Sequence, residues 1–370
     1  MTADAASSPC CTESVIDVSA AHYISWFPDI GLADRPKVGG KGGSLGELQR
    51  AGIDVPPGFV VRTEAFGEFI DALEQRSPLR ARVDALAADE LDAMAAVSSE
   101  LRARMQETPL PPALQQAIRD AYERLGESAA PGRVPAAVAV RSSATTEDSA
   151  DASFAGLQDT YLWVTQADSL MDKIRSCWAS LYSLESLSYR RRQGIAESTV
   201  AMAVVVQIMV DARTAGVMFT RSPISGDRSV ISIEGAWGLG SALVSGEVTP
   251  DHWVVAKITG EIPVREISDK AIRHARSPAG GVEELAVEES MRREPCLSDE
   301  ELQSLRAIGR RVERHYGRPQ DIEWAIDRHT QRILLLQSRP ETVWSNKDNQ
   351  AAARPTDPLL HVMNVFGGRR

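Results

Sequence analysis

The chain has 370 residues, of which 43% are hydrophobic and 25% are charged, and its formal net charge is -10. This composition is typical of a globular protein, and the length suffices for two or three compact lobes. The acidic balance argues against a nucleic acid or an anionic membrane as the main partner, because such partners require a basic surface.

The N-terminus lacks the basic and apolar regions of a signal peptide. No stretch of the sequence approaches the roughly 20 apolar residues of a membrane span. The four cysteines show no C-x-x-C spacing, so we expect reduced thiols rather than a zinc site or a redox pair. These features together predict a cytoplasmic protein.

The first half of the chain is predominantly helical by its pattern. Residues 1–20 are small, polar and aperiodic, and we expect a loose tail there. Helical periodicity dominates residues 65–127 and returns over residues 167–194, where Gly194 suits the end of a helix. Between these helical stretches, the apolar run PAAVAV that ends at Val140 predicts a buried strand.

After residue 200 the period changes to that of strands. The strand-like runs are MAVVVQIMV, GVMFT, SVISIEGAWG, HWVVAKITGEI, DIEWAI and RILLLQSRP. Helices followed by strands predict an α+β fold of two lobes, 21–199 and 200–345, with a cleft between them. Residues 346–370 resemble a linker.

The first candidate site is the glycine-rich segment GGKGGSLGEL, which contains Lys41. Ser44 begins the spacing of a capping box, which predicts a helix start near Leu45, and Gly52 suits the end of that helix. Residues 39–43 would then form a loop whose backbone amides and lysine favour a bound phosphate. The segment is neither a Walker A loop nor a complete G-x-G-x-x-G motif, so a flexible turn remains an alternative.

The second candidate site begins at Arg141, where we expect the apolar strand AVAV to end. Such strand ends commonly present ligand-binding groups. Ser142, Ser143, Thr145 and Thr146 follow, and their short hydroxyl side chains suit phosphate oxygens. The alternative is a polar turn with an exposed arginine.

The third candidate site is the hairpin DIEWAIDRHTQRILLLQSRP. Its alternation places Glu323 opposite the apolar face, and Gln337 and Arg339 share a face of the returning strand. If the hairpin is symmetric about Thr330, the Cβ atoms of Glu323 and Gln337 lie roughly 5 Å apart. A carboxylate and an amide oxygen suit Mg²⁺, and Arg339 would neutralise nucleotide phosphates. An ordinary amphipathic hairpin with a solvated polar face is the alternative.

These three segments, in this order, resemble the N-terminal ATP-grasp domain of the PEP/pyruvate-binding type. That domain is shared by phosphoenolpyruvate synthase, pyruvate phosphate dikinase and rifampin phosphotransferase. The resemblance extends from about residue 20 to Trp344. Its most specific pieces are GGKGGSLGEL, AVRSSATTEDSADASFAGLQDTYL, MAVVVQIMV with GVMFTRSP, EGAWGLG with SGEVTPD, and DIEW with LLLQSRPET. It implies an ATP-grasp fold that binds Mg-ATP between two lobes.

The resemblance also implies which residues contact the nucleotide. They are Lys41, Arg141, Gly156, Thr160, Gln207, Glu323, Gln337 and Arg339. Gln207 matches the residue at the adenine end of the cleft, and Gly156 and Thr160 match positions close to the nucleotide. Glu323 and Gln337 match the magnesium contacts, in agreement with the geometry expected of the hairpin.

The implied activity is transfer of a phosphoryl group from ATP to a histidine. Lys41 and Arg141 match phosphate-binding residues, and Arg339 matches the arginine that stabilises the phosphoryl group in transfer, so these three are the candidate catalytic residues. The expected products are AMP, inorganic phosphate and a phosphohistidine, as in a pyruvate-water-dikinase-like phosphotransferase.

The chain departs from the dikinase pattern at the expected phosphoryl acceptor. Its six histidines are His22, His252, His274, His315, His329 and His361. None lies in the short Thr-Cys-His type of motif that carries the dikinase histidine. The resemblance to split enzymes such as phenylphosphate synthase implies that a separate partner subunit carries this histidine. That subunit would phosphorylate a small-molecule acceptor, such as a phenol or cresol.

Two other functions are compatible with the same motifs. One is an ATP-grasp ligase that activates a carboxylate as an acyl phosphate, and the other is a regulatory subunit that senses a nucleotide without turnover. A second departure is Ser241, which stands where relatives often have an acidic residue. This departure leaves the predicted phosphate contacts intact.

Overall fold

A computed structural model of the chain describes residues 22–87, 89–129, 136–145, 159–342 and 344. The first sheet comprises β1 (Ile24–Trp26), β2 (Gly58–Val61), β3 (Val138–Ala144), β4 (Thr160–Val164) and β5 (Met202–Ile208), in the order β1-β2-β5-β3-β4. The second comprises β6 (Ala212–Phe219), β7 (Val230–Trp237), β8 (Asp251–Ala256), β9 (Val264–Glu266), β12 (Gln320–Asp327) and β13 (Ile333–Pro340), in the order β13-β12-β6-β7-β8-β9. A separate hairpin pairs β10 (Ile272–Arg276) with β11 (Val282–Ala286).

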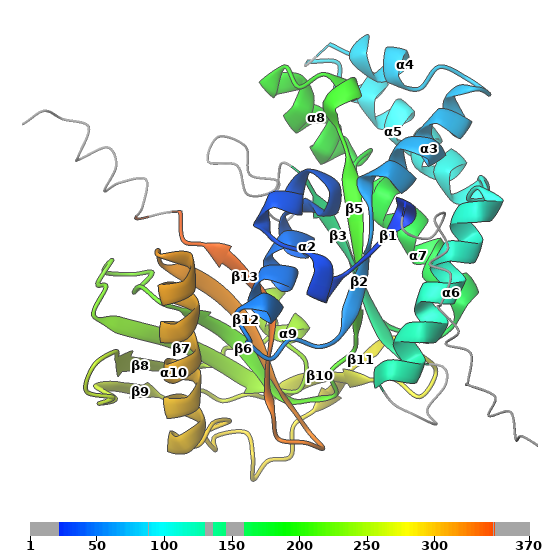
Figure 1. Cartoon of the computed structure of the whole chain (residues 1–370). Helices are drawn as coiled ribbons and strands as arrows, with labels where there is room; N and C mark the ends of the chain where they lie inside the picture. The colour runs from blue at the N-terminus through cyan, green and yellow to red at the C-terminus, as the bar shows by residue number, and fades with distance from the viewer. Residues whose placement is uncertain (1–21, 88, 130–135, 146–158, 343, 345–370) are drawn as a thin grey trace, which may run out of the picture.

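Helices cover both sheets (Figure 1). They are α2 (Arg35–Arg50), α3 (Thr63–Glu74), α4 (Arg80–Asp84), α5 (Leu91–Glu107), α6 (Pro112–Ala129), α7 (Ala167–Ser180), α8 (Leu184–Gln193), α9 (Ser241–Val244) and α10 (Asp299–Tyr316). Gly194 takes a left-handed conformation and ends α8, as predicted. The paired strands of each sheet are antiparallel, and the helices lie outside them, so the α+β class is confirmed. No helix in the described part of the chain is long and apolar enough to cross a membrane.

The central strand β5 is buried on both faces because its side chains are apolar on both. Val204 and Val206 belong to a core shared with α3, α5, α6, α7 and α8. Ala203 and Val205 belong to a smaller core shared with α2. The sheets therefore divide between β5 and β6, one strand later than the predicted lobe boundary at residue 200.

Helix α10 covers one face of the second sheet. Leu302, Leu305 and Val312 of this helix pack against a core that includes Trp253 and Trp324. Side chains alternate along β12, so Glu323 faces away from α10 while Ile322 and Trp324 face toward it. Figure 1 shows α2 lying between β13 of this sheet and the first sheet. The open face of the second sheet is thus turned toward α2 and β3.

A buried ion pair anchors β8 within the second sheet. Asp251 and Lys270 are both fully buried, and the Lys270 ammonium lies 2.6 Å from the Asp251 carboxylate. The backbone amides of Ser268 and Cys296 also donate to that carboxylate, each at 2.9 Å. The charge of Asp251 is therefore neutralised by one cation and further bonded by two amides.

Removing the cation of this pair should destabilise the fold strongly. We expect Lys270→Met to lower the free energy of unfolding by about 3–5 kcal/mol, because it leaves a buried carboxylate without a counter-charge. Arg265→Met is the matched control, since it breaks an exposed pair with Asp299 and should cost less than about 1 kcal/mol. Urea unfolding curves of both variants measure the difference. Equal losses would contradict the role assigned to Lys270.

Candidate functional site

Arg141 of β3 reaches across from the first sheet to the hairpin of the second. One terminal nitrogen of its guanidinium donates to the carbonyl of Leu336 at 2.8 Å. The other donates to Oε2 of Glu323 at 2.8 Å and to Oε1 of Gln337 at 3.0 Å. The arginine side chain is only 11% exposed. Three of the predicted site residues thus meet at one point between the sheets.

The register of the hairpin explains why these two acceptors lie together. Glu323 of β12 is directly opposite Gln337 of β13, so the cross-strand pairing predicted from the sequence is confirmed. The next pair joins Trp324 to Leu335, which leaves Leu336 as the extra residue of a β-bulge. The bulge lets the Leu336 carbonyl accept a hydrogen bond from Arg141.

Arg339 lies two cross-strand pairs beyond Gln337, on the same face of β13. It is directly opposite Asp321, and its Nε donates to Oδ2 of that residue at 3.3 Å. Burial raises the pKa of Asp321, and the nearby Arg339 guanidinium opposes that shift. The sequence reasoning missed Asp321, although its spacing of two from Glu323 on a strand was the available signal. The Arg339 side chain remains 50% exposed.

Thr160 and Gln207 lie on the same face of the first sheet as Arg141. Thr160 is directly opposite Arg141 across β3 and β4, and directly opposed residues project to one face. Gln207 is opposite Ala139, which is two residues from Arg141 on β3. Gln207 is buried, and its amide donates to the Pro56 carbonyl at 3.3 Å. Gly156 lies outside the described residues.

The glycine-rich segment is helical, and the loop and capping box predicted for it are wrong. Helix α2 begins at Arg35 and is broken only at Gly39, whose φ is 71°. Ser44 lies inside the helix, where its hydroxyl donates to the carbonyl of Ser338 on β13. The helix ends near the predicted Gly52, whose φ is 67°. The glycines allow this helix to pack between two sheets, which the local pattern could not indicate.

Gly39 has no room for a side chain. A Cβ atom there would lie 2.1 Å from the backbone oxygen of Ser143 on β3. The break at Gly39 also starts a second helical segment, and its Gly42 amide donates to the Ser143 hydroxyl at 3.2 Å. Lys41 is held within that segment, against the sheet that carries Arg141.

Lys41 lies near the end of the first sheet at which β4 begins. It is half-buried, and its charge acts on the Cys177 thiol. Burial raises the pKa of Cys177 strongly, the Asp159 carboxylate raises it further, and Lys41 opposes both. Asp159 directly precedes Thr160, so Lys41 and Thr160 lie in the same region of the site.

The hydroxyl groups after Arg141 are used in bonds within the protein. Ser142 donates to the Asp159 carbonyl at 3.2 Å, and Ser143 donates to the Val38 carbonyl at 2.9 Å. Thr145 donates to the Ala201 carbonyl at 3.4 Å, and Thr146 lies outside the described residues. Strand β3 continues to Ala144, so Arg141 lies within the strand rather than at its end. The predicted hydroxyl cluster is therefore wrong for the three described residues, whose partners are distant in the sequence.

A hollow lies beside Glu323, between the second sheet and α9. Its lining residues are Gly216, Val217, Gly240, Leu243, Val244, Glu323, Trp324 and Leu336. Gly240 and the short α9 helix border this space next to the carboxylate. The hollow is continuous with the Arg141 cluster through Glu323 and Leu336.

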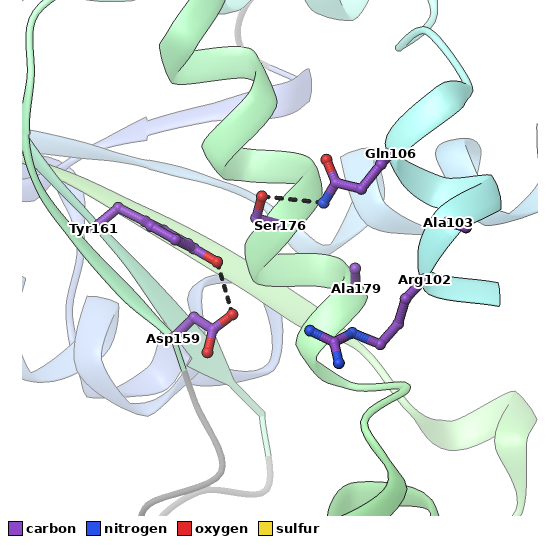
Figure 2. A pocket seen from close by; sticks show the side chains of 7 residues that line it. All are labelled: Arg102, Ala103, Gln106, Asp159, Tyr161, Ser176 and Ala179. Carbon is purple, nitrogen blue, oxygen red and sulfur yellow. Dashed lines mark hydrogen bonds between the residues drawn. The ribbon is translucent and has the colours of Figure 1, made fainter. Parts of the chain in front are cut away.

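A second pocket, of about 230 Å³, lies between α5, α7 and the start of β4 (Figure 2). In it the Tyr161 hydroxyl donates to Asp159 at 2.7 Å, and the Gln106 amide donates to Ser176 at 3.0 Å. Tyr161 follows Thr160 on β4, so it projects to the opposite face from Arg141. This pocket is therefore on the helical side of the sheet, away from the Arg141 cluster.

The segments that form the site correspond to a known domain. Residues 35–358 match the family described as pyruvate phosphate dikinase, AMP/ATP-binding domain. The chain belongs to this family. The match includes α2, β3 and the β12–β13 hairpin, so a dikinase-type ATP-binding domain contains each part of the cluster described above.

Curated relatives agree with the family. The chain is 41% identical over 366 residues to phosphoenolpyruvate synthase from Aeropyrum pernix, which covers 90% of this chain and 44% of the relative. It is 37% identical over 386 residues to phosphoenolpyruvate synthase from Pyrococcus furiosus, and the alignment covers 94% of this chain and 47% of the relative. It is 42% identical over 315 residues to rifampicin phosphotransferase from a Streptomyces species, and the alignment covers 85% of this chain and 35% of the relative. The chain spans less than half the length of each of these three relatives.

Among solved structures, D-alanyl-alanine synthetase A from Vibrio cholerae has 12% sequence identity and a TM-score of 0.25, covering 68% of this chain and 57% of the other. This likeness is too slight to carry an argument. The family match and the two sheets of the chain itself support the expected nucleotide-binding fold.

Filling the space at Gly39 should disturb the site without touching a charged group. Gly39→Ala should weaken Mg-ATP binding at least tenfold, because the Cβ clash and the positive φ force α2 away from β3. Gly67→Ala in α3 is the control, since a Cβ there meets no atom within 4 Å and alanine favours a helix. Isothermal titration calorimetry compares the two. Parental affinity in the Gly39 variant would show that this break does not position the nucleotide.

Proposed function

We propose that this chain uses Mg-ATP to phosphorylate a histidine on a separate partner subunit, and that the partner then phosphorylates a small-molecule acceptor. The chain belongs to a family of dikinase ATP-binding domains, and its relatives include phosphotransferases. The observation that carries the proposal is the convergence of Arg141, Glu323 and Gln337 between the sheets. In this cluster an arginine, a residue type that commonly binds phosphate, contacts two side-chain oxygens that suit a metal ion.

Magnesium fits the two oxygen ligands. Oε2 of Glu323 and Oε1 of Gln337 both accept from one nitrogen of Arg141, so the two oxygens already share a single cationic group. A carboxylate and an amide oxygen are the hard donors that Mg²⁺ prefers, usually together with nucleotide phosphates. Glu323 and Gln337 would hold the ion, and the ion would neutralise charge on the phosphates. Because the ion would take the two oxygens that Arg141 now contacts, the guanidinium would turn toward the phosphates of the nucleotide.

Positioning and charge neutralisation are what this chain would contribute to the reaction. Lys41, Arg141 and Arg339 would hold the triphosphate, with the adenine near Gln207. The three basic residues lie on α2, β3 and β13, and α2 contacts both strands. Phosphoryl transfer depends mainly on such orientation and on electrostatic stabilisation.

The histidines of this chain support an acceptor on another subunit. Each of the five that the structure describes lies beside a carboxylate. The pairs are His22 with Glu68, His252 with Glu266, His274 with Glu247, His315 with Glu47 and His329 with Asp211. The sixth, His361, lies outside the described residues. None of the six lies in the short Thr-Cys-His type of motif that carries the dikinase histidine, so our proposal assigns the phosphorylated histidine to a partner and includes a phenol or cresol as the final acceptor.

The two alternative functions differ in their products. An acyl-phosphate ligase would release ADP and need its own carboxylate acceptor, and a nucleotide-sensing subunit would release neither ADP nor AMP. We favour the dikinase function because the chain belongs to a family of dikinase ATP-binding domains.

Arg339 should act on the rate more than on ATP binding. Arg339→Ala should lower phosphoryl transfer to the partner by ~10² or more while weakening ATP binding less, as expected for a contact that strengthens in the transition state. Arg332→Ala is the control, because Arg332 lies at the turn end of β13 and pairs with the exposed Asp54. Rapid-quench kinetics with the partner measure the rates. If the Arg339 variant transfers the phosphoryl group at the rate of the unmodified protein, the hairpin has no catalytic role.

The fate of each phosphate decides the reaction type. The partner histidine is expected to attack the β-phosphorus, so that the bond to the α,β-bridging oxygen breaks and AMP leaves. Water then releases the γ-phosphate as inorganic phosphate. Incubating this chain and the partner with ATP labelled at the β or the γ position should leave β-label on the partner and γ-label in phosphate. Transfer of γ-label to the partner with release of ADP would refute the dikinase reaction, and rapid AMP formation by this chain alone would refute the separate acceptor.

A further inference from the structure

His274 occupies the junction between α9 and the β10–β11 hairpin. It lies on β10 directly opposite Glu284 of β11, and its backbone bridges to Leu239 just before α9. Its side chain is 15% exposed, whereas Glu247 and Glu284 are exposed at the surface. A half-buried imidazole is thus held at the base of two solvent-facing carboxylates.

Three ligand atoms meet at this junction. Nε2 of His274 lies 3.1 Å from Oε2 of Glu247, and the ligand atoms of His274, Glu247 and Glu284 all lie within 4.8 Å of one another. Ligands of a tetrahedral zinc ion stand roughly 3.3 Å apart, since each is about 2 Å from the metal. The two glutamates are exposed, so small rotations of their side chains suffice to close the triangle.

A residue outside the triangle fixes the imidazole. The Ser241 hydroxyl lies 2.8 Å from Nδ1 of His274. With Nδ1 protonated and donating to Ser241, the lone pair of Nε2 is directed toward two anionic carboxylates. A histidine that binds a metal has this arrangement, because its second nitrogen is bonded to a neighbouring group that sets the tautomer and the ring orientation. Ser241 is the first residue of α9, so its hydrogen bond to His274 also joins this helix to β10.

We propose that Glu247, His274 and Glu284 bind one divalent transition-metal ion of the zinc type. The imidazole favours zinc over magnesium, and three protein ligands leave a fourth position for water. This site is separate from the oxygen pair of Glu323 and Gln337. Its ligands come from the turn after α9, from β10 and from β11, so the ion joins that turn to the β10–β11 hairpin.

The bound ion has a structural consequence for the nucleotide site. Leu243 and Val244 of α9 line the hollow beside Glu323, and α9 has only four residues. Joining the turn after α9 to the β10–β11 hairpin holds this wall of the hollow in place. Binding of the ion does not depend on the phosphotransferase function, because its ligands are not those of the nucleotide.

Zinc binding by the complete chain tests the proposal without nucleotide. Cys10 and Cys11 are first changed to serine, so that their thiols do not bind the metal. Calorimetric titration of this background with Zn²⁺ should give one site per chain, and Mg²⁺ at the same concentration should not compete. His274→Gln should weaken binding at least about thirtyfold and Glu284→Gln at least about tenfold.

Two further variants make the outcome specific. Glu283→Gln changes the neighbouring carboxylate, which projects to the other face of β11, and should bind zinc as tightly as the background. Glu323→Gln should also retain zinc binding, whereas a loss there would place the ion at the nucleotide site and overturn the proposal. Circular dichroism confirms that each variant folds.

The competing structure is an ion pair of a protonated imidazole with the two carboxylates. In that case the background would bind no zinc at this junction, while His274→Gln would still lower the melting temperature. That result, or zinc binding of equal strength in the His274 and Glu284 variants and the background, overturns the proposal. A rise in melting temperature with Zn²⁺ that is lost in both variants supports it.

Discussion

The guanidinium of Arg141 is the contact on which the relation of the two sheets depends. Burying a charged group costs free energy unless its hydrogen bonds are replaced, and here three acceptors bond to the two terminal nitrogens, while the buried Nε has no partner among the described residues. All three acceptors belong to the β12–β13 hairpin, while the arginine belongs to β3. The same contact therefore docks the second sheet on the first and gathers the oxygen ligands at one point. A ligand that competes for Arg141 must act on the junction itself.

Helix α2 makes that approach possible. Gly42 lies against β2, where an added Cβ would lie 3.0 Å from the Val60 side chain, and Gly39 lies against the backbone of Ser143. Because glycine has no Cβ, the backbone of α2 can come close to a neighbouring strand. The Ser44 hydroxyl then bonds to β13, so one helix contacts both sides of the site. Lys41 is carried into the site by this packing and not by a flexible loop.

Basic groups and oxygen ligands are thus concentrated at one junction in a chain that is acidic overall. Such local concentration suits a triphosphate, because the surrounding protein does not need to be positive. The hollow beside Glu323 lies between this junction and α9. Ser241, the first residue of α9, bonds to His274. The residues proposed to bind the nucleotide and those proposed to bind the metal are therefore linked through one short helix. Because α9 has only four residues, its position depends on the contacts at its two ends.

The sequence by itself determined the α+β class and the strands of the hairpin, because both follow from periodicity, a local property of the chain. The pairing of Glu323 with Gln337 was predicted from symmetry about the turn, but the structure reaches it through the bulge at Leu336, since the next pairs join Trp324 to Leu335 and Ile326 to Ile333. The motifs of the family likewise lie in contiguous segments, so they could be identified without coordinates.

Only the tertiary structure decided how the polar groups are used. Ser143 and Ser44 bond to segments far away in the chain, and the same hydroxyls in a different packing would be open to a ligand. The glycines around Lys41 were compatible with a loop or a helix, and contact with two sheets selected the helix. Asp321 acquires its partner and its raised pKa only when the hairpin is buried. A residue pattern specifies which faces are apolar, but the partner of each polar atom depends on which surfaces meet.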